Sequence, residues 1–383
     1  MTIVENKLTD YLSINVSETE TAWSDTALYN YRDEVRYGHY IYGWAGEDNS
    51  NTTENPSFIY DRDKNIYPQW VKLRATNYWA ALDDKTSTQT TKTIATSATT
   101  DATGYSIGAT VITLASAGTG EIIAGDIINF TGDTNDYVIE VGDSDVSDGG
   151  TITLASGLIQ AIPASATAIT VQSKLIIELS NDSYDTITLL NIDATDVNIQ
   201  LIDTTTSDIL FDGDYDLSNA IDIIDEKSYW YAPFDFKKNL YEPNLNMLSS
   251  TKIKVTLALA GGEPSVGRIV CGQGYFIAGT SFPAKIDQIT YSRFETDIFG
   301  NTDLQQGESI KYKTYKMYPP LGKLPVLERK RKELTAIPLL FIADESVDSI
   351  VENDLTYGYF PTSPFNVTNN ARFGIDLEIK GLL

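Results

Sequence analysis

The chain has 383 residues, more than one hydrophobic core usually supports, which predicts two to four compact units. An apolar content of 42% excludes wholesale disorder, and the abundance of Thr, Ile, Val and Tyr favours β-strands over helices. The formal net charge of −25 argues against nucleic acid and anionic membranes as partners, because both repel so acidic a chain.

The single cysteine and the length of the apolar runs indicate the cellular compartment in which the chain is made. Cys271 has no partner for an internal disulfide, which fits a reducing cytoplasm, and its apolar neighbours predict a buried, inert thiol. No run approaches the ~20 apolar residues of a membrane span. Residues 1–10 lack the apolar core of a signal peptide. We therefore expect a protein made in the cytoplasm, with no membrane span and no leader.

The first 73 residues predict an arm followed by a small aromatic unit. Residues 1–20 are polar and weakly patterned, which suits a flexible arm or an extended strand that docks on a neighbour. Residues 21–73 are rich in Trp and Tyr, and so small a unit must obtain much of its burial from stacked rings. Tyr42, Trp44 and Trp70 also offer flat faces on which a sugar could stack, so a core role and glycan contact both stay open for them.

Residues 93–173 predict a small β-domain inserted into a host domain. Thr/Ser/Ala-rich runs at residues 86–93 and 95–103 have the composition of a linker with too little apolar surface to pack. Five short apolar runs, separated by turns that contain glycine, then predict the strands of a small β-barrel. These runs are residues 109–114, 126–130, 137–141, 151–154 and 168–171.

Residues 74–92 and 174–300 predict the host domain. Apolar and polar residues alternate over some hundred positions after residue 174, with no helical period, which indicates a β-sandwich. Strands are expected at residues 175–179, 186–190, 197–202, 209–211, 252–259, 267–270 and 275–278.

Residues 301–383 predict a C-terminal α+β domain. Residues 324–334 have the composition of a helix, with Pro325 near the start, where a missing N–H costs little. Strands are expected to follow at residues 337–343 and 373–381, where apolar residues again alternate with polar ones.

Basic side chains gather on this predicted helix although the chain as a whole is acidic. A solvated face is one interpretation, since Glu328 and Lys332 are spaced for an i,i+4 pair. A docking surface is the other, because assemblies of acidic subunits commonly match acidic faces to basic ones. The solvated face is the default interpretation, and a docking surface formed by Lys323, Arg329, Lys330, Arg331 and Lys332 is the preferred candidate for an interface.

The sequence offers little for catalysis, so we expect no enzyme, no metal site and no cofactor. The only histidine, His39, has no Gly-x-Ser-x-Gly nucleophile turn to serve, and one Cys with one His cannot build a zinc site. Acids between Asp212 and Glu226 leave a carboxylate-pair glycosidase open, with a solvated loop favoured. The run from Asp143 to Asp148 is spaced like a cation loop but lacks its distal Glu, which favours a simple turn.

Residues 21–73 resemble the small aromatic carbohydrate-binding modules of bacterial chitinases. Those modules have an opening Trp, a Tyr some six residues later, an acidic-Val step, a paired aromatic strand and a closing Trp. The matching residues are Trp23, Tyr29, Asp33-Glu34-Val35, Tyr40-Ile41-Tyr42 and Trp70. Residues 45–67 depart from the modules by being longer and richer in Asn and acids. The resemblance implies their scaffold, with glycan contact by Tyr42, Trp44 and Trp70.

Other stretches resemble proteins of bacteriophage tail gene clusters. A Thr-Asn-aromatic-Trp step at residues 76–83, a longer run at 284–301 and a Leu-Glu-Ile-x-Gly-Leu end at 377–382 carry this resemblance. The long middle run, with its Tyr-Ser-Arg-x-Glu-Thr-Asp core, is the most specific of the three. The insert is similar to small β-units of phage virion proteins around residues 124–130. The host sandwich looks like a galactose-binding-type jelly roll, at the level of the fold alone.

The resemblances imply a structural protein of a bacteriophage tail. We expect a non-enzymatic virion component of the baseplate or tail tip, made in the host cytoplasm. It would bind other tail proteins and form a homo-oligomer within a symmetric assembly. A glycan-binding adhesin that recognises the host surface is the first alternative. A polysaccharide depolymerase that uses the acids between Asp212 and Glu226 is the second.

Overall fold

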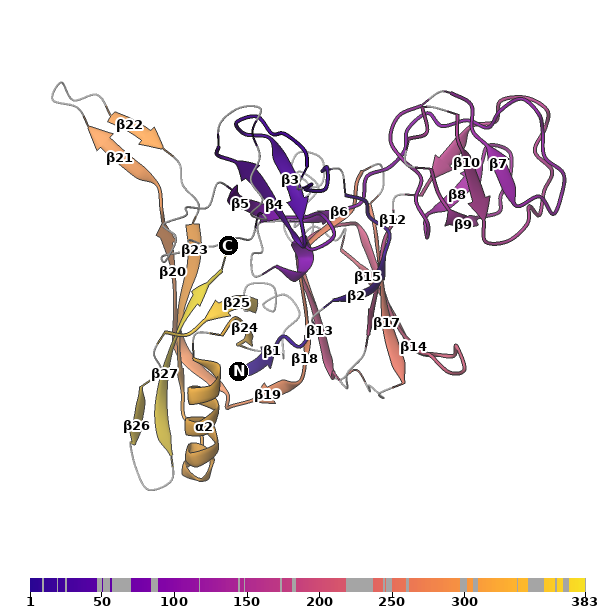
Figure 1. Ribbon diagram of the computed structural model, residues 1–383. Coiled ribbons are helices and arrows are strands. Elements are labelled where there is room, and N and C mark those ends of the chain that lie inside the picture. Colours follow the sequence, from indigo (N-terminus) through magenta and orange to yellow (C-terminus); the bar gives the residue numbers. More distant parts are fainter. Residues whose placement is uncertain are drawn as a thin grey trace, which may run out of the picture.

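The computed structural model (Figure 1) is built from antiparallel β-sheets. Within its described part there is one α-helix, α2 (Leu324–Leu334), which follows the short 3-10 turn η2 (Leu321–Lys323). The predicted mainly β class is therefore confirmed, and the helix has the bounds that the sequence predicted. The structure describes all residues except 9, 19, 25, 47–49, 51–55, 57–69, 84–88, 117, 144, 148, 173, 181–183, 218–236, 244, 246–249, 260–261, 297–301, 306–308, 336, 344–354, 362–363, 368–371 and 383.

Two sheets face each other and form the host sandwich (Figure 1). In spatial order, one contains β15 (Ile209–Asp216), β14 (Asp196–Asp203), β17 (Thr251–Ala258), β12 (Lys174–Ser180) and β2 (Tyr11–Ile14). The other contains β16 (Asn239–Glu242), β13 (Thr186–Asp193), β18 (Ser265–Gly272) and β6 (Thr90–Thr91). Every second residue of β12 and β17 is buried between the sheets, among them Leu175, Ile177 and Val255. The sandwich predicted from this alternation is confirmed.

The insert has five strands around its own apolar cluster. Their order is β11 (Ile169–Val171), β8 (Ile127–Phe130), β9 (Tyr137–Val141), β10 (Thr151–Leu154) and β7 (Val111–Thr113). The predicted barrel is wrong in one respect, because strand pairing does not close it. Isolated bridges from Thr99 to Ala168 and from Thr100 to Leu114 cross the remaining gap instead. Thr99 and Thr100 each form one isolated bridge to a different segment, so they do not make a continuous sixth strand.

The Thr/Ala-rich run before the insert packs, although its composition predicted a linker. Ala95 and Ala98 are buried in the core of the insert, and Thr100 is buried beside them. Small side chains let another backbone approach closely here: a Cβ added to Gly118 would lie 2.9 Å from the carbonyl oxygen of Thr96. The run therefore contributes through close backbone packing, which hydrophobicity alone does not reveal.

The aromatic unit is a three-stranded sheet of β3 (Glu34–Tyr37), β4 (Tyr40–Trp44) and β5 (Trp70–Ala75), followed by the 3-10 turn η1 (Ala80–Leu82). The turn between β3 and β4 requires a positive φ of 60° at Gly38, which glycine adopts without strain. Tyr29, Val35, Tyr42, Trp44 and Trp70 form its core.

The last sheet has eight strands. The spatial order is β19 (Gly274–Phe276), β1 (Thr2–Glu5), β24 (Leu339–Ile342), β25 (Leu355–Tyr359), β27 (Phe373–Gly381), β23 (Ser309–Met317) and β20 (Thr280–Thr290), with β26 (Phe365–Val367) paired to β27. Strands β1, β19 and β20 come from outside residues 301–383, to which the sequence assigned this domain. A hairpin of β21 (Arg293–Thr296) and β22 (Thr302–Gln305) projects beyond the end of β20 (Figure 1).

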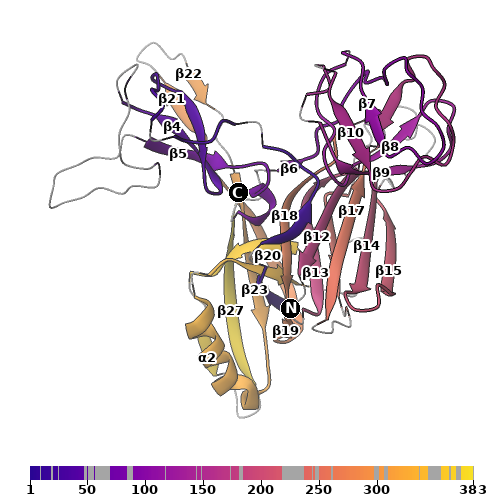
Figure 2. The ribbon, with the colours of Figure 1, turned by 45° about the vertical axis from the view of Figure 1, so that its right-hand side comes forward.

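The elements stack in layers (Figures 1 and 2). Helix α2 covers one face of the eight-stranded sheet, whose other face packs against β13 and β18 of the sandwich. Strand β18 is buried at every position because both of its faces are covered. The predicted N-terminal arm is two strands within these layers, since β1 pairs with β19 and β24 while β2 pairs with β12. It docks on its own chain.

Candidate docking site beside helix α2

A groove of about 650 Å³ runs along α2. Helix α2 forms one wall, and β1 with β19 forms the other. Its volume lies within the range of pockets that bind ligands or side chains of a partner. The floor is apolar and includes Ile3, Met317, Leu327, Leu334, Ile375 and Leu377.

The helix is fixed on the sheet by its apolar side and by its ends. Leu327 is buried against the sheet, and Pro325 occupies an early helical position that needs no N–H donor. Before the helix, Lys323 Nζ donates to the carbonyl oxygen of Ile277 at 3.1 Å. After it, Thr335 Oγ1 donates to the carbonyl oxygen of Arg331 at 2.6 Å. The groove wall is therefore held at both ends.

Cationic side chains line the rim of the groove above the apolar floor. Lys330 and Arg331 line it from α2, and Lys7 lines it from the opposite wall beside the acidic Glu5. The Arg331 guanidinium lies 4.4 Å from the centre of the Phe365 ring. A guanidinium stacked on a ring presents planar N–H donors that match the oxygens of a carboxylate. Lys7 and Lys330 have only exposed ion pairs, with Glu5 at 2.8 Å and with Glu333 at 3.5 Å. Such pairs contribute little, so a partner's carboxylate can replace them.

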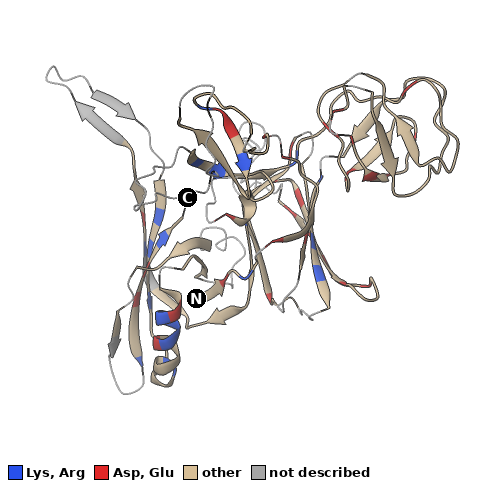
Figure 3. Cartoon of the chain, in the orientation of Figure 1, with Lys and Arg blue, Asp and Glu red and all other residues tan. Residues whose placement is uncertain are grey.

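The structure divides the five predicted docking residues into three groups. Lys330 and Arg331 line the groove, whereas Arg329 and Lys332 are exposed on the helix and lie outside it. Lys323 binds backbone carbonyl groups at β19 and lies over the Phe276 ring, so its part is to hold the helix. Figure 3 shows the Lys and Arg residues gathered along α2. The sequence therefore located the helix, while the apolar groove beneath it depends on strands from three separate parts of the chain.

The predicted glycan-contact residues are core residues of the aromatic unit. Trp44 is 2% exposed, and Tyr42 and Trp70 are buried with it. The Trp44 and Trp70 rings meet edge to face, with centroids 4.7 Å apart. A sugar cannot stack on a ring face that protein atoms already cover. Burial of these three rings therefore supports the core role, and glycan contact at Tyr42, Trp44 and Trp70 stays an untested prediction.

The histidine and the acidic group also have structural surroundings. His39 stacks on Trp79 with ring centroids 3.9 Å apart. Asp212 and Asp214 are exposed on the edge strand β15, where Asn198 Nδ2 donates to both. The remaining acids of the predicted group, from residue 222 to 226, lie outside the described residues. The described part of the group is a solvated strand face.

The run from Asp143 to Asp148 is a turn in its described part. Asp145 Oδ1 accepts hydrogen bonds from the backbone N–H and the hydroxyl of Ser147, and these bonds lower the pKa of the Asp145 carboxyl. Residues 144 and 148 lie outside the described residues. Over the part of the chain that the structure describes, no group of three or more His, Cys, Asp or Glu side chains is placed to hold a metal ion.

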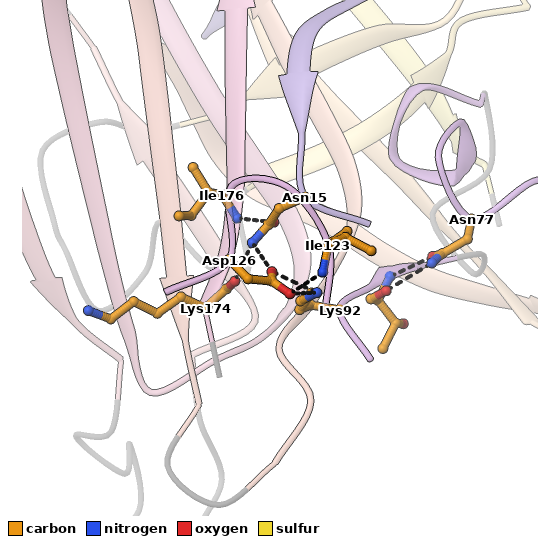
Figure 4. A network of polar contacts seen from close by, with 8 residues as sticks. Asn15, Asn77, Lys92, Ile123, Asp126, Lys174 and Ile176 are labelled. Atoms are coloured by element: carbon orange, nitrogen blue, oxygen red, sulfur yellow. Dashed lines mark hydrogen bonds and ion pairs between the residues drawn. The ribbon is translucent and has the colours of Figure 1, made fainter. Parts of the chain in front are cut away.

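An ion pair that the sequence did not predict joins the insert to the sandwich (Figure 4). Lys92 Nζ lies 2.8 Å from Asp126 Oδ1, and each side chain is only 1% exposed. The other Asp126 oxygen, Oδ2, accepts a hydrogen bond from the N–H of Ile123. Asn15, which directly follows β2, donates from Nδ2 to Asp126 Oδ1. Lys92 is the only charged residue between positions 86 and 100. A single cation in an uncharged stretch was the feature of the sequence that could have indicated a buried ion pair.

The predicted Thr-Asn-aromatic-Trp step contributes to the same junction. Asn77 Nδ2 donates to the carbonyl oxygen of Thr91, and Asn77 Oδ1 accepts the N–H of Thr91, a reciprocal pair also seen in Figure 4. Glu18 accepts the N–H groups of Asn77 and Tyr78. The step therefore ties the N-terminal segment to β6.

Cys271 is expected to be inert in the folded protein. Its side chain is fully buried in the sandwich core, and this burial raises the pKa of the thiol far above its ordinary range. A thiol reagent at pH 8 should modify less than about a tenth of the native chains in the time that modifies all chains unfolded in guanidinium. Rapid modification of the native protein, at the rate of the unfolded control, would contradict the buried position.

Comparison of the chain with protein-family models, curated protein sequences and solved structures gave no match. Among the described helices, none is long and apolar enough to cross a membrane.

Proposed function

We propose that this chain is a structural subunit of a bacteriophage tail, located at the baseplate or tail tip, which works by binding other protein subunits. The groove beside α2 carries the proposal. An apolar floor beneath a basic rim suits the capture of an apolar, acidic segment of a protein. Such a surface also suits a chain whose other parts are acidic.

The way in which the groove is built supports the proposal. Its floor and walls belong to the eight-stranded sheet and to α2, and the sheet is packed on the sandwich by its other face. A surface set on packed layers keeps its shape, so little conformational entropy is lost on binding. The resemblance to tail gene-cluster proteins is most specific at residues 284–301, which extend from β20 into the projecting hairpin of Figure 1. A projecting element is suited to reach a neighbour.

Purified tails or whole virions of the phage that encodes this chain are expected to contain it. Quantitative mass spectrometry should give a fixed copy number for each particle, because a structural subunit occupies a defined set of positions. Immunogold labelling should then mark one end of the tail. A cytoplasmic host protein from the same lysate serves as the control for contamination. Particles that lack the chain, or contain it only at the level of that control, would refute the proposal.

A further inference from the structure

We infer that the groove beside α2 binds the β14–β15 hairpin of a second copy of this chain. The inference rests on the proposed function in so far as it takes protein contact to be the role of the groove. It adds the identity of the partner and the segment that enters.

The tip of the β14–β15 hairpin combines apolar and acidic side chains at the surface. Residues 204–208 form the exposed turn, and Ile209 and Leu210 directly after it are 54% and 48% exposed. Asp208 and Asp212 flank these two apolar residues. Leu210 and Asp212 are both exposed on β15, and the pairing with β14 shifts register at Leu210, which has no partner residue across the ladder. An apolar pair between carboxylates is the complement of an apolar floor below a basic rim.

The hairpin tip is also held in one shape before it binds. Asp203 Oδ1 accepts the N–H of Thr205 at 2.7 Å, and the N–H of Ser207 donates to the Asp203 carbonyl oxygen at 2.9 Å. Thr204 Oγ1 donates to the carbonyl oxygen of Ser250 at 2.7 Å. A segment that is already ordered loses little entropy when it enters a groove.

The distribution of charge along the chain favours this partner. Residues 301–383 contain 10 of the 28 Lys and Arg residues and 11 of the 53 Asp and Glu residues, so this part is almost neutral. Residues 1–300 contain the remainder and are strongly acidic. Two copies that meet through like parts of residues 1–300 repel each other, whereas the hairpin of one copy is attracted to α2 of the next.

The positions of the two surfaces require a second copy. Figures 1 and 2 place α2 and the β14–β15 hairpin on opposite sides of the molecule, so a hairpin cannot reach the groove of its own chain. A contact between two different surfaces of identical chains is head-to-tail, and its repetition yields a closed ring or an open filament. A closed ring of this kind would suit the position at the baseplate or tail tip that the proposed function assigns.

Two charge-reversal variants test the contact by sedimentation velocity at low ionic strength. The groove variant is Lys330→Glu with Arg331→Glu, and the hairpin variant is Asp208→Lys with Asp212→Lys. We expect the wild-type chain to self-associate and each variant to raise the dissociation constant about tenfold or more. An equimolar mixture of the two variants should associate again, with the two chains in a 1:1 ratio, because each acidic surface then meets a basic one.

Matched controls carry the same change of charge elsewhere. Arg329→Glu with Lys332→Glu changes the same helix outside the groove, and Asp196→Lys with Asp216→Lys changes the far end of the same hairpin. Both controls should associate within about threefold of wild type, since only long-range charge differs. Equal loss in a variant and its control, or failure of the mixture to associate, would overturn the inference.

A zero-length carbodiimide cross-link tests the contact inside the particle and separates the two proposals. In assembled tails, an amide between Lys330 Nζ and the carboxyl of Asp208 or Asp212 of another copy is expected. Particles that contain the chain without this cross-link, together with a wild-type chain that stays monomeric, would overturn the inference and leave the proposed function standing. A chain that forms the cross-link in solution but is absent from particles would support the inference and refute the proposed function.

Discussion

Replacement of Lys92 by methionine is expected to lower the free energy of unfolding by about 3–5 kcal/mol. The Lys92 ammonium and the Asp126 carboxylate are both buried, with Nζ and Oδ1 2.8 Å apart. Removing the cation leaves the carboxylate in a site that water does not reach, supported only by hydrogen bonds such as that from Ile123. Urea unfolding followed by circular dichroism measures the loss, and hydrogen exchange at residues 122–130 should show where it acts.

Two further variants identify the cause of that loss. Lys252→Met removes one partner of the Lys252–Glu178 pair, whose side chains are 28% and 24% exposed, and should cost less than about 1 kcal/mol. Lys92→Met combined with Asp126→Asn removes both charges and should recover most of the stability. A single Lys92→Met variant as stable as Lys252→Met would show that the buried pair does not hold the insert on the sandwich.

The loss is also expected to depend on pH. Burial raises the pKa of Asp126 above its ordinary value of 3.8, against the opposing effect of Lys92. The folded chain therefore binds a proton where the unfolded chain does not, so the carboxyl's contribution to stability decreases as the pH rises from 3.8 through the raised pKa. Without Lys92 that pKa rises further. The deficit of Lys92→Met should be largest at neutral pH and shrink toward about pH 4, and a deficit constant with pH would contradict this.

Trp44→Ala is expected to destabilise the aromatic unit by about 3–5 kcal/mol. Trp44 is 2% exposed and packs on Trp70 and Tyr29, so its removal opens a cavity in a core of few side chains. Tryptophan fluorescence during urea unfolding should report the loss. Tyr31→Ala is the matched control, because Tyr31 is 58% exposed, and it should stay within about 0.5 kcal/mol of wild type.

A conservative variant, Trp44→Phe, tests glycan binding. If a wild-type chain bound a glycan by stacking on Trp44, then Trp44→Phe, which retains an apolar ring, would keep the fold and alter the affinity. The buried position instead predicts that wild type and Trp44→Phe behave alike on a glycan array. A folded Trp44→Ala variant as stable as Tyr31→Ala would show that the ring is not part of the core.

The positions of the strands and of the helix were predictable where one face of the element is buried and the other is exposed to solvent. Strand β12 alternates between buried and half-buried residues over its length, and a period of two in the sequence reveals such a strand. Helix α2 was predictable from Pro325 and from its long side chains. Strand β18 is covered on both faces and is buried at every position, so it shows no alternation of burial, and its ends were predicted less closely.

The candidate site was predictable only in part. A cluster of cations in an acidic chain indicated α2, and the sequence places Lys330 and Arg331 there. It did not indicate which of the five cations face a groove, because the opposite wall is formed by β1 and β19, more than forty residues away along the chain. For the β14–β15 hairpin, the sequence predicted strands at residues 197–202 and 209–211 and an acidic group beginning at Asp212, but no docking role.

By itself, the sequence determined the β class, most strand positions, the helix and the uneven distribution of charge. These follow from local periodicity and composition, which depend on residues a few positions apart. Tertiary structure alone decided that β1 and β2 enter two different sheets, that Trp44 lies inside its unit and that Lys92 meets Asp126. Each of these depends on which distant segment covers a residue, and burial of that kind is a property of the packed layers that no local pattern contains.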